Sequence, residues 1–467
     1  MTSAVLLIAA IHLEPCQVAG VRETLRCGTL EVAENRRAPG GRRIALRVVV
    51  VPAAEPRPDT APLFHLEGGP GVAASDMAAL YATEVPEYRR HRDVVLVDQR
   101  GTGGSNPLRC AWDEMRARLE RMYPPEAVAE CRRQLEARAD LTQYTTEAAA
   151  DDSDDVRAAL GYDRIDLFGL SYGTRHALVY MRRHPEHVRS AVLMGPAPTD
   201  LSMPLHHAQD GQRALDMLFE DCASDAACGR AFPQLRPELA GVLDRLAAEP
   251  APLTLNDPRT GAAQTYHLTR GAFAEEIRRR LYAPATRITV PLVIHQAAQG
   301  DYGPLVEAVA RGSGGPTIAE GLYLSVTCAE DVPFIDAAMA ERLAAGTVFG
   351  LYRVQEQRGA CQEWPRASVA EEFRRPVESK APTLILSGDR DPITPPRLGD
   401  EVLRHLPNGR HRVIPQAAHA PMGIEPMSCL DGVLLSFYEN PLASNLEDGC
   451  LKEMRAPPFV LRSPGSP

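Results

Sequence analysis

A single serine stands between two glycines in residues 169–173, GLSYG, after a short apolar run and before a helix-like stretch. This arrangement fits the pattern G-x-S-x-G, in which a sharp turn between a strand and a helix pushes a serine hydroxyl out of the sheet. The glycines make room for neighbouring backbone, and the N-terminus of the following helix stabilises developing negative charge. A purely structural turn would use the same glycines, so the motif needs partners. Ser171 is the candidate nucleophile.

A serine hydroxyl needs a base to take its proton and an acid to orient that base. In the chain order Ser…Asp…His, both partners follow the serine at the ends of later strands, and Asp391 and His419 end two such apolar runs. Asp391 is preferred to Asp389 because it lies further into the loop, where its side chain can turn back toward the histidine. His411, before the last run, is the weaker rival, and Asp-Pro is also ordinary turn chemistry. The sequence predicts a triad of Ser171, Asp391 and His419.

Acyl transfer also needs N–H donors for the oxyanion. One predicted donor is the backbone N–H of Tyr172, the residue after the nucleophile. The other is expected from a loop early in the sheet, and EGGPG (residues 67–71) follows an apolar run there. By itself such a loop is only a turn. Together with the serine motif it predicts Gly68 or Gly69 as the second donor.

Eight runs rich in Val, Ile and Leu end in small or polar residues and are predicted strands. The first two are expected to form a hairpin because the second partly alternates, and the later ones have the continuous apolar character of strands buried on both faces. Helix-like stretches at 145–160 and 172–184 lie among them, so the fold class is α/β, with a mostly parallel doubly wound sheet. The runs are residues 28–32, 43–51, 62–69, 93–101, 165–171, 190–196, 382–391 and 410–419.

The strand–helix rhythm stops between about residue 198 and residue 375, where amphipathic helical patterns dominate. We expect a largely helical cap inserted over the carboxyl ends of the strands, where open α/β sheets bind ligands. The predicted domains are an N-terminal extension or export-signal remnant, the first part of the core, the cap, and the second part of the core with a C-terminal tail. Their ranges are 1–20, 21–197, 198–375 and 376–467.

The charge of the chain argues against nucleic acid as a partner. The 467 residues carry a formal net charge of −10, and no run of basic residues of the phosphate-binding kind is present. The one apolar stretch near the start, Ala4 to Ile11, is too short to span a bilayer. It is similar to the apolar part of a secretory signal but lacks preceding basic residues, and a short first strand is the alternative.

Ten cysteines fall into five local pairs, and no C-x2-C unit indicates a zinc site. The pairing favours disulfides and an oxidising compartment, so export to the periplasm or medium is predicted, with the cytoplasm as the alternative. Sequence alone does not fix the connectivity. The local pairs are Cys16/Cys27, Cys110/Cys131, Cys222/Cys228, Cys328/Cys361 and Cys429/Cys450.

The chain resembles the prolyl aminopeptidase and tripeptidyl aminopeptidase family of α/β-hydrolases. The matching segments span most of the core, and the cysteine-rich pattern is most similar to the exported, tripeptidyl-aminopeptidase branch. The resemblance implies an α/β-hydrolase fold, the same triad and oxyanion donors, a peptide substrate with a free N-terminus, and no metal or organic cofactor. The cytosolic prolyl enzymes carry histidine where this chain has Glu67. The segments are EGGPG, VDQRGTGGS, GLSYGT, GDRDPITP and AAHAP.

An exopeptidase must recognise a free α-amino group, which buried acids do best through charged hydrogen bonds. Glu330 and Asp331 in the cap region, and Glu67 beside the glycine loop, are the candidates. The alternative for the first two is a solvated acidic turn. Arg100 is expected to hold its loop in place rather than to bind substrate.

The predicted function is a serine hydrolase that removes N-terminal residues from peptides through an acyl-enzyme. A carboxylesterase or lipase-like enzyme with the same triad is the main alternative, because a fold does not determine the substrate. A catalytically inactive hydrolase used as a binding module is the third reading.

Overall fold

The computed structural model describes residues 11–256, 261–312 and 317–462. Its described residues form a nine-stranded sheet in the order β1-β2-β3-β5-β4-β6-β7-β10-β11, antiparallel at the first four strands and parallel from β5 onward. The strands are β1 (Glu14–Cys16), β2 (Leu25–Ala33), β3 (Arg43–Val51), β4 (Leu63–Leu66), β5 (Val94–Val97), β6 (Ile165–Leu170), β7 (Val188–Met194), β10 (Thr383–Gly388) and β11 (Gly409–Ile414).

Each of the eight predicted strands is present, and the first two form the predicted hairpin as β2 and β3. The four residues of β4 and the four of β5 are all buried, as expected for parallel strands covered on both sides. The apolar stretch proposed as a signal lies almost entirely outside the described residues.

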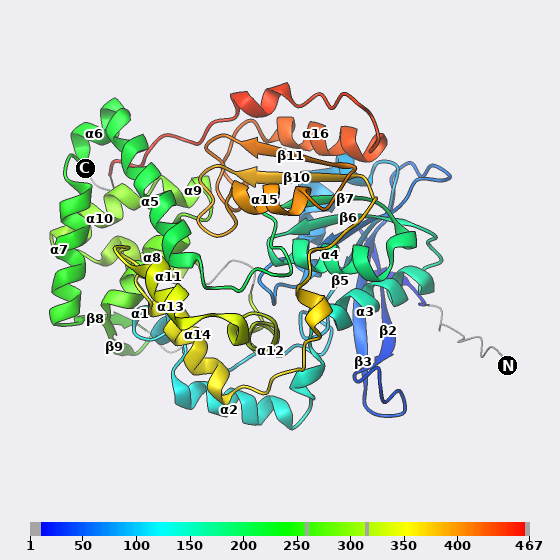
Figure 1. Ribbon diagram of the computed structural model, residues 1–467, viewed down its shortest axis with the longest axis horizontal. Helices are drawn as coiled ribbons and strands as arrows, with labels where there is room; N and C mark the ends of the chain where they lie inside the picture. The colour runs from blue at the N-terminus through cyan, green and yellow to red at the C-terminus, as the bar shows by residue number, and fades with distance from the viewer. Residues whose placement is uncertain (1–10, 257–260, 313–316, 463–467) are drawn as a thin grey trace.

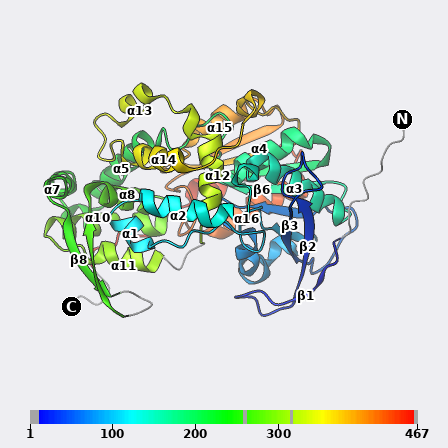
Figure 2. The same ribbon diagram turned by 90° about the horizontal axis from the view of Figure 1, so that it is seen from below.

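Helices cover both faces of the sheet, which is the doubly wound arrangement that the sequence predicts. One apolar cluster joins one face to α16 and to the turns near Tyr81, and a second joins the other face to α3, α4 and α15. Figures 1 and 2 show the sheet between these helices, with the cap beside it. The core helices are α3 (Thr146–Ala159), α4 (Tyr172–Arg183), α15 (Pro396–Leu403) and α16 (Met427–Glu439).

Between β7 and β10 the chain forms the helical region that the sequence predicts as a cap. It also contains a hairpin, β8–β9, that the sequence analysis missed, although both strands alternate in burial. The elements are α5 (His207–Ser224), α6 (Ala226–Ala231), α7 (Leu235–Ala248), β8 (Ala251–Asn256), β9 (Ala263–Leu268), α8 (Arg270–Arg280), α9 (Pro284–Arg287), α10 (Val290–Ala298), α11 (Gly303–Gly312), α12 (Glu320–Glu330), α13 (Ala337–Ala344) and α14 (Tyr352–Glu363).

Two helices from the first part of the chain also lie against this region. They are α1 (Glu114–Leu119), which packs near α8 and β9, and α2 (Pro125–Glu136), which packs against α14. The Arg118 guanidinium on α1 binds the Glu276 carboxylate on α8 at 2.6 Å. The surface facing the core is therefore built from two stretches of chain. The range 198–375 remains our proposed boundary for the inserted cap.

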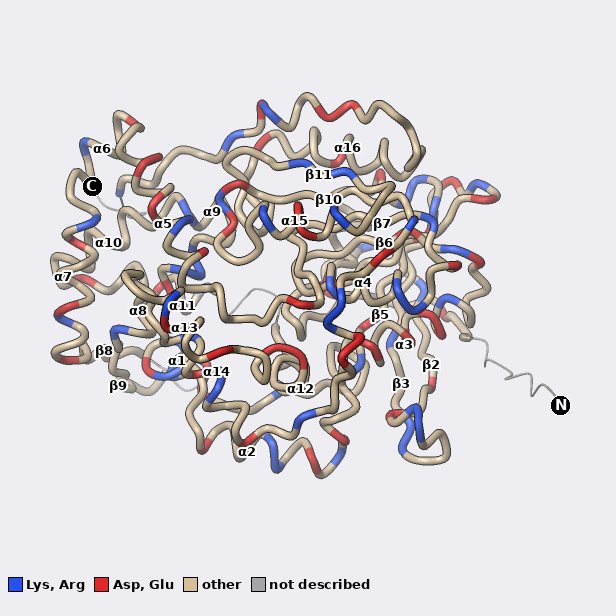
Figure 3. Tube along the Cα trace, in the orientation of Figure 1, with Lys and Arg blue, Asp and Glu red and all other residues tan. Residues whose placement is uncertain are grey.

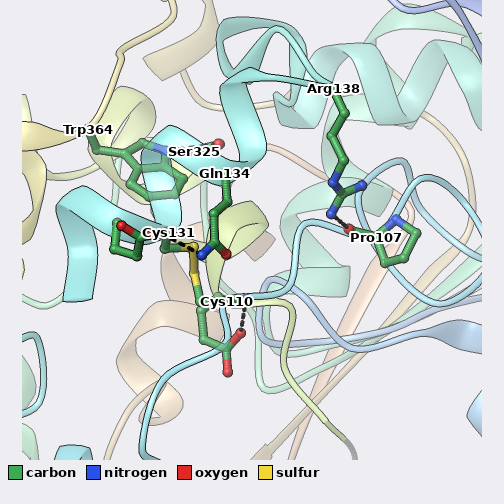
Figure 4. The surroundings of a disulfide bond; sticks show 9 residues. Pro107, Cys110, Cys131, Gln134, Arg138, Ser325 and Trp364 are labelled. Atoms are coloured by element: carbon green, nitrogen blue, oxygen red, sulfur yellow. Dashed lines mark hydrogen bonds between the residues drawn. A yellow bond between two sulfur atoms is a disulfide. The ribbon is translucent and has the colours of Figure 1, made fainter.

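All ten cysteines form disulfides, and the pairs are the five local ones seen in the sequence. Figure 4 shows the Cys110–Cys131 bridge near Trp364, whose indole N–H donates to the Ser325 hydroxyl at 3.0 Å. Within the described residues no helix is long and apolar enough to cross a membrane.

Candidate active site

Ser171 stands at the turn between β6 and α4, in a backbone conformation that residues other than glycine rarely adopt. Its φ is 56° and its ψ is −120°. The flanking glycines allow this turn, because a Cβ at Gly173 would lie 1.9 Å from the carbonyl oxygen of Leu66 and one at Gly169 would lie 2.5 Å from that of Gly173. The GLSYG segment therefore folds into the strained strand–turn–helix that presents a serine side chain at the sheet edge.

Asp391 and His419 are directly hydrogen-bonded, with Asp391 Oδ2 2.8 Å from His419 Nδ1. The backbone N–H groups of Ile393 and Thr394 donate to the other carboxylate oxygen at 2.7 and 2.8 Å. Burial opposes ionisation of this carboxyl, but the charge and hydrogen bond of His419 and the two N–H groups hold the pKa of Asp391 below its usual value. The pair has the geometry of an oriented base and its acid.

Thr394 completes this pair, and the sequence analysis did not single it out. Its hydroxyl lies 2.9 Å from Asp391 Oδ2 and 3.0 Å from His419 Nδ1, and the residue is fully buried. Its place three residues after the acid, within GDRDPITP, was the signal available in the sequence.

Ser171 and His419 both lie against the end of β7. The Ser171 N–H donates to the carbonyl oxygen of Met194 at 2.9 Å. The next residue, Gly195, lies against the histidine, since a Cβ there would be 3.2 Å from His419 Cε1. The structure thus brings the predicted nucleophile and the predicted base to the same strand end.

The rival residues lie in other contacts. The Asp389 carboxylate binds its neighbour Arg390 at 2.7 Å. His411 bonds to Asp400 Oδ1 at 2.9 Å and to the Ser387 hydroxyl at 3.0 Å. These contacts leave Asp391 and His419 as the better candidates.

The glycine loop lies beside the serine, as the sequence predicts. A Cβ at Gly68 would be 3.2 Å from the Ser171 Cβ, which explains a glycine at that position. The Gly68 N–H, however, donates to Glu67 Oε2 at 2.8 Å. Tyr172 is the first residue of α4, and the first N–H groups of a helix have no partner within it. These contacts favour Gly69 over Gly68 as the donor that accompanies Tyr172.

The Glu67 side chain is 8% exposed and bonded to its own loop and strand. Its Oε1 lies 2.8 Å from His65 Nε2, and the other ring nitrogen of His65 lies 2.7 Å from the Tyr81 hydroxyl. Burial disfavours the charged form, but the contacts with His65 and the Gly68 N–H keep the pKa of Glu67 below its ordinary value. Glu67 therefore supports the glycine loop.

Glu330 and Asp331 are 1% and 0% exposed, so the alternative of a solvated acidic turn is wrong. Asp331 Oδ1 binds Arg175 at 3.0 Å and accepts from the Met203 N–H at 3.1 Å, while Asp331 Oδ2 has no hydrogen-bond partner among the described residues. Arg175 lies on α4, one turn after the serine. This cluster ties the end of α12 to the helix that carries the nucleophile.

The Glu330 carboxylate accepts from the N–H and the hydroxyl of Thr146 at 2.7 and 2.6 Å. That hydroxyl lies 2.9 Å from the hydroxyl of Tyr172, which also accepts from Gln99 at 3.0 Å. Burial raises the pKa of Glu330 to about 7 despite the nearby Arg175. A hydrogen-bonded chain therefore runs from the cap to the residue proposed as an oxyanion donor.

Arg100 holds its loop in place, as its position in the sequence predicts. Its guanidinium makes two hydrogen bonds to the Asp152 carboxylate at 2.6 and 2.7 Å and donates to the carbonyl oxygens of Glu34 and Gln143. These contacts with the protein support a structural role for Arg100.

A group of potential metal ligands lies elsewhere, at Asp154, His184 and His187. The Asp154 carboxylate already binds Arg157 at 2.7 Å and accepts from the Tyr180 hydroxyl at 2.8 Å. A guanidinium in this position competes with a cation for the carboxylate, so we interpret the group as an ion-pair network.

Comparison with known proteins identifies the fold family of the chain. A family model described as alpha/beta hydrolase fold matches residues 61–304, and one described as TAP-like protein matches residues 346–450. The chain belongs to the α/β-hydrolase family. This α/β hydrolase carries the TAP-like segment across α14, β10, α15, β11 and α16, where Asp391 and His419 lie.

The hydrolase is distantly similar to serine peptidases. It is 24% identical over 430 residues to the serine protease Hip1 of Mycobacterium tuberculosis, which covers 81% of this chain and 79% of that protein. It is 28% identical over 207 residues to a tripeptidyl aminopeptidase of Streptomyces lividans, covering 40% and 38%. The solved proline iminopeptidase of Mycobacterium smegmatis is 18% identical, with a TM-score of 0.39, covering 88% of this chain and 98% of that one.

Proposed function

We propose that this α/β hydrolase is an exported serine peptidase that removes residues from the N-terminus of peptides through an acyl-enzyme. The observation that carries the proposal is the buried Asp391–His419 hydrogen bond at the strand edge where Ser171 is presented. The distant serine peptidases support the peptide substrate, and the five disulfides, typical of oxidising compartments, support export.

In the proposed reaction, His419 takes the proton of the Ser171 hydroxyl as its oxygen attacks the scissile carbonyl carbon. The resulting oxyanion receives hydrogen bonds from the N–H groups of Tyr172 and Gly69. His419 then gives the proton to the leaving amine as the C–N bond breaks. Water, deprotonated by His419, hydrolyses the acyl-enzyme, and the proton returns to Ser171.

The chemistry at Ser171 is tested by comparing Ser171→Ala with the native protein. Labelling by a fluorophosphonate should be lost in the variant, and turnover should fall by at least about 10⁴-fold, because the covalent step is removed. Circular dichroism checks that the fold is retained. Full activity in a folded Ser171→Ala protein would overturn the proposed nucleophile.

The peptidase claim needs its own test, because Glu330, Asp331 and Glu67 already bind groups of the protein. We keep them as candidates for recognising the α-amino group, directly or through the loops that they hold. Three substrates separate the functions: a peptide amide with a free amine, its N-acetylated form, and a short-chain ester. An aminopeptidase should cleave the first far better than the second. Equal cleavage of both, or cleavage of the ester alone, would favour the esterase alternative.

A further inference from the structure

A cluster of buried charged residues lies in the cap next to the proposed catalytic histidine. Tyr282, just after α8, places its ring edge-on to His419, with ring centres 5.3 Å apart, and its carbonyl oxygen accepts from the Ala420 N–H at 2.8 Å. The Tyr282 hydroxyl accepts from Arg278 at 3.1 Å. The guanidinium of Arg278 is therefore one side chain away from His419.

Positive charge exceeds negative charge in this cluster. Nη2 and Nε of the Arg278 guanidinium donate to the two oxygens of the Glu275 carboxylate, at 2.5 and 2.8 Å. Arg353, on α14, lies 3.8 Å from the same carboxylate, which is its only ion-pair partner among the described residues. Arg278 and Arg353 are both largely buried, and both lie near the Glu275 carboxylate, which Arg278 already binds. Buried charges are normally paired, so an additional anion would be stabilised here.

Several donors in the cluster have no partner. His207 is 6% exposed, and neither of its ring nitrogens has a hydrogen-bond partner within the described chain. The same holds for Nε of Arg353, whose terminal nitrogens reach the Tyr323 hydroxyl and the Met122 sulfur. A neutral histidine and a guanidinium both offer N–H groups to an acceptor.

The cluster is open to solvent from one side. His207, Arg278 and Arg353 line a cavity of about 10 Å³, room for one water-sized group such as a carboxylate oxygen. That cavity shares Gly271 and Tyr352 with an open depression of about 520 Å³ between α8, α13 and α14. Figure 3 shows acidic and basic residues interspersed along these elements.

We propose that Arg353, Arg278 and His207 form a subsite that binds a carboxylate of the substrate. The carboxylate belongs to an acidic side chain or to the free C-terminus of a short peptide. The proposal rests on the proposed peptidase function and names its substrate class, peptides that carry a negative charge near the cleaved bond. Of the two arginines, Arg353 has the weaker carboxylate partner, because it only approaches Glu275 at 3.8 Å, so it should contribute most of the discrimination for charge.

Binding to the Ser171→Ala protein tests the subsite without requiring turnover. Dissociation constants are measured by calorimetry for trialanine amides with Glu or Gln at each of the three positions, and for trialanine as free acid and as amide. The charged member of at least one pair should bind at least about ten-fold more tightly than its neutral partner. The position of that pair distinguishes a side-chain carboxylate from a C-terminal one.

Variants in the same background assign the effect to Arg353. Arg353→Met should reduce the charge preference to less than about two-fold, and Arg353→Lys should retain part of it. Glu275→Gln removes the competing carboxylate and should raise the preference. Arg342→Met, an exposed arginine of α13, is the matched control and should leave the preference unchanged.

The proposal is wrong if the charged and neutral members of every pair bind equally to the Ser171→Ala protein, or if no peptide binds. It is also wrong if a charge preference persists in folded Arg353→Met. If that variant does not fold, Glu275→Gln decides, because an unchanged preference there would count against the subsite. Failure of the peptidase function is seen separately, as absence of peptide cleavage by the native enzyme.

Discussion

At the scale of single residues, the Thr394 hydroxyl helps to orient the proposed catalytic acid and base. It contacts both Asp391 Oδ2 and His419 Nδ1, at 2.9 and 3.0 Å. Thr394→Val keeps the shape but removes the hydroxyl. A hydrogen bond to a charged group contributes about 1.5–3 kcal/mol, so kcat should fall by about ten-fold or more. KM should change much less, because Thr394 is fully buried against Asp391 and His419.

Thr394→Ser is the matched control, since it keeps the hydroxyl and should retain most of the activity. Activity of Thr394→Val equal to that of the native enzyme would show that Asp391 alone orients the base.

A substitution at Gly173 tests the strand–turn–helix that presents Ser171. An alanine there would place its Cβ 1.9 Å from the carbonyl oxygen of Leu66, so the turn must move. Gly173→Ala should lower the free energy of unfolding by at least about 2 kcal/mol and reduce fluorophosphonate labelling of Ser171. Gly241 on α7 is the control, because a Cβ there meets nothing within 4 Å. Gly241→Ala should stabilise the protein by up to about 1 kcal/mol, as measured by denaturant unfolding.

At the scale of elements, the strands and the triad candidates were predictable because their signals are local. β4 and β5 are continuous apolar runs, and Ser171, Asp391 and His419 each follow such a run directly. Parallel strands bring their carboxyl ends to one edge, so this rule alone predicts that Ser171 and His419, 248 positions apart in the chain, lie at the same edge of the sheet.

The contacts of the cap were not predictable in this way. The bond between Arg175 on α4 and Asp331 after α12 joins two segments with no shared pattern, and the same acidic pair is consistent with a solvated turn. The β8–β9 hairpin was missed because the exposed residues of β8 alternate with only partly buried ones, which weakens the apolar signal of that strand. These contacts depend on how elements far apart in the chain pack together, and a single sequence does not show that packing.

The buried carboxyl of Glu330, at the end of α12, predicts how the stability of the protein depends on pH. Burial raises the pKa of Glu330 to about 7 from its ordinary value of 4.5, so the folded state binds this proton more tightly than the unfolded state. The stabilisation is complete below the lower pKa and is lost as pH rises through the upper one. At about 1.4 kcal/mol per pKa unit, its size is roughly 3 kcal/mol.

Glu330→Gln stays neutral at every pH and still accepts from Thr146. Between about pH 4.5 and about pH 8, the free energy of unfolding should therefore fall by roughly 3 kcal/mol more in the native protein than in the variant. Denaturant unfolding at the two pH values measures both. Groups such as Arg175, Asp331 and Tyr172 are common to the two proteins, so equal slopes would mean that Glu330 does not titrate in this range.

At the scale of the whole molecule, some disulfides join elements of the core and others join helices of the cap. Cys16–Cys27 joins β1 to β2, and Cys429–Cys450 joins α16 to the segment after it. Cys328–Cys361 joins α12 to α14, the two helices that carry Glu330 and Arg353. Cys222–Cys228 closes a short turn between α5 and α6, away from that pair of helices.

Two of these bridges form a matched comparison, because all four of their cysteines are buried. The Cys328–Cys361 bridge spans 33 residues and the Cys222–Cys228 bridge spans 6. By the loop-entropy relation, replacing both cysteines with alanine should cost roughly 4 kcal/mol for the first and roughly 2 kcal/mol for the second. Denaturant unfolding of the two double variants, compared with the native protein, measures this difference.

The longer bridge should also matter for activity. Without it α12 and α14 are held together by packing and by side-chain hydrogen bonds such as that from Gln357 to Thr327, so Glu330 should hold Thr146 and Tyr172 less firmly. The Cys328→Ala/Cys361→Ala protein should lose at least about ten-fold in kcat at a temperature where it is still folded, while Cys222→Ala/Cys228→Ala should stay near the native value. Equal losses in the two variants would mean that the bridges act only on global stability. The α12–α14 contact would then have no effect of its own on kcat.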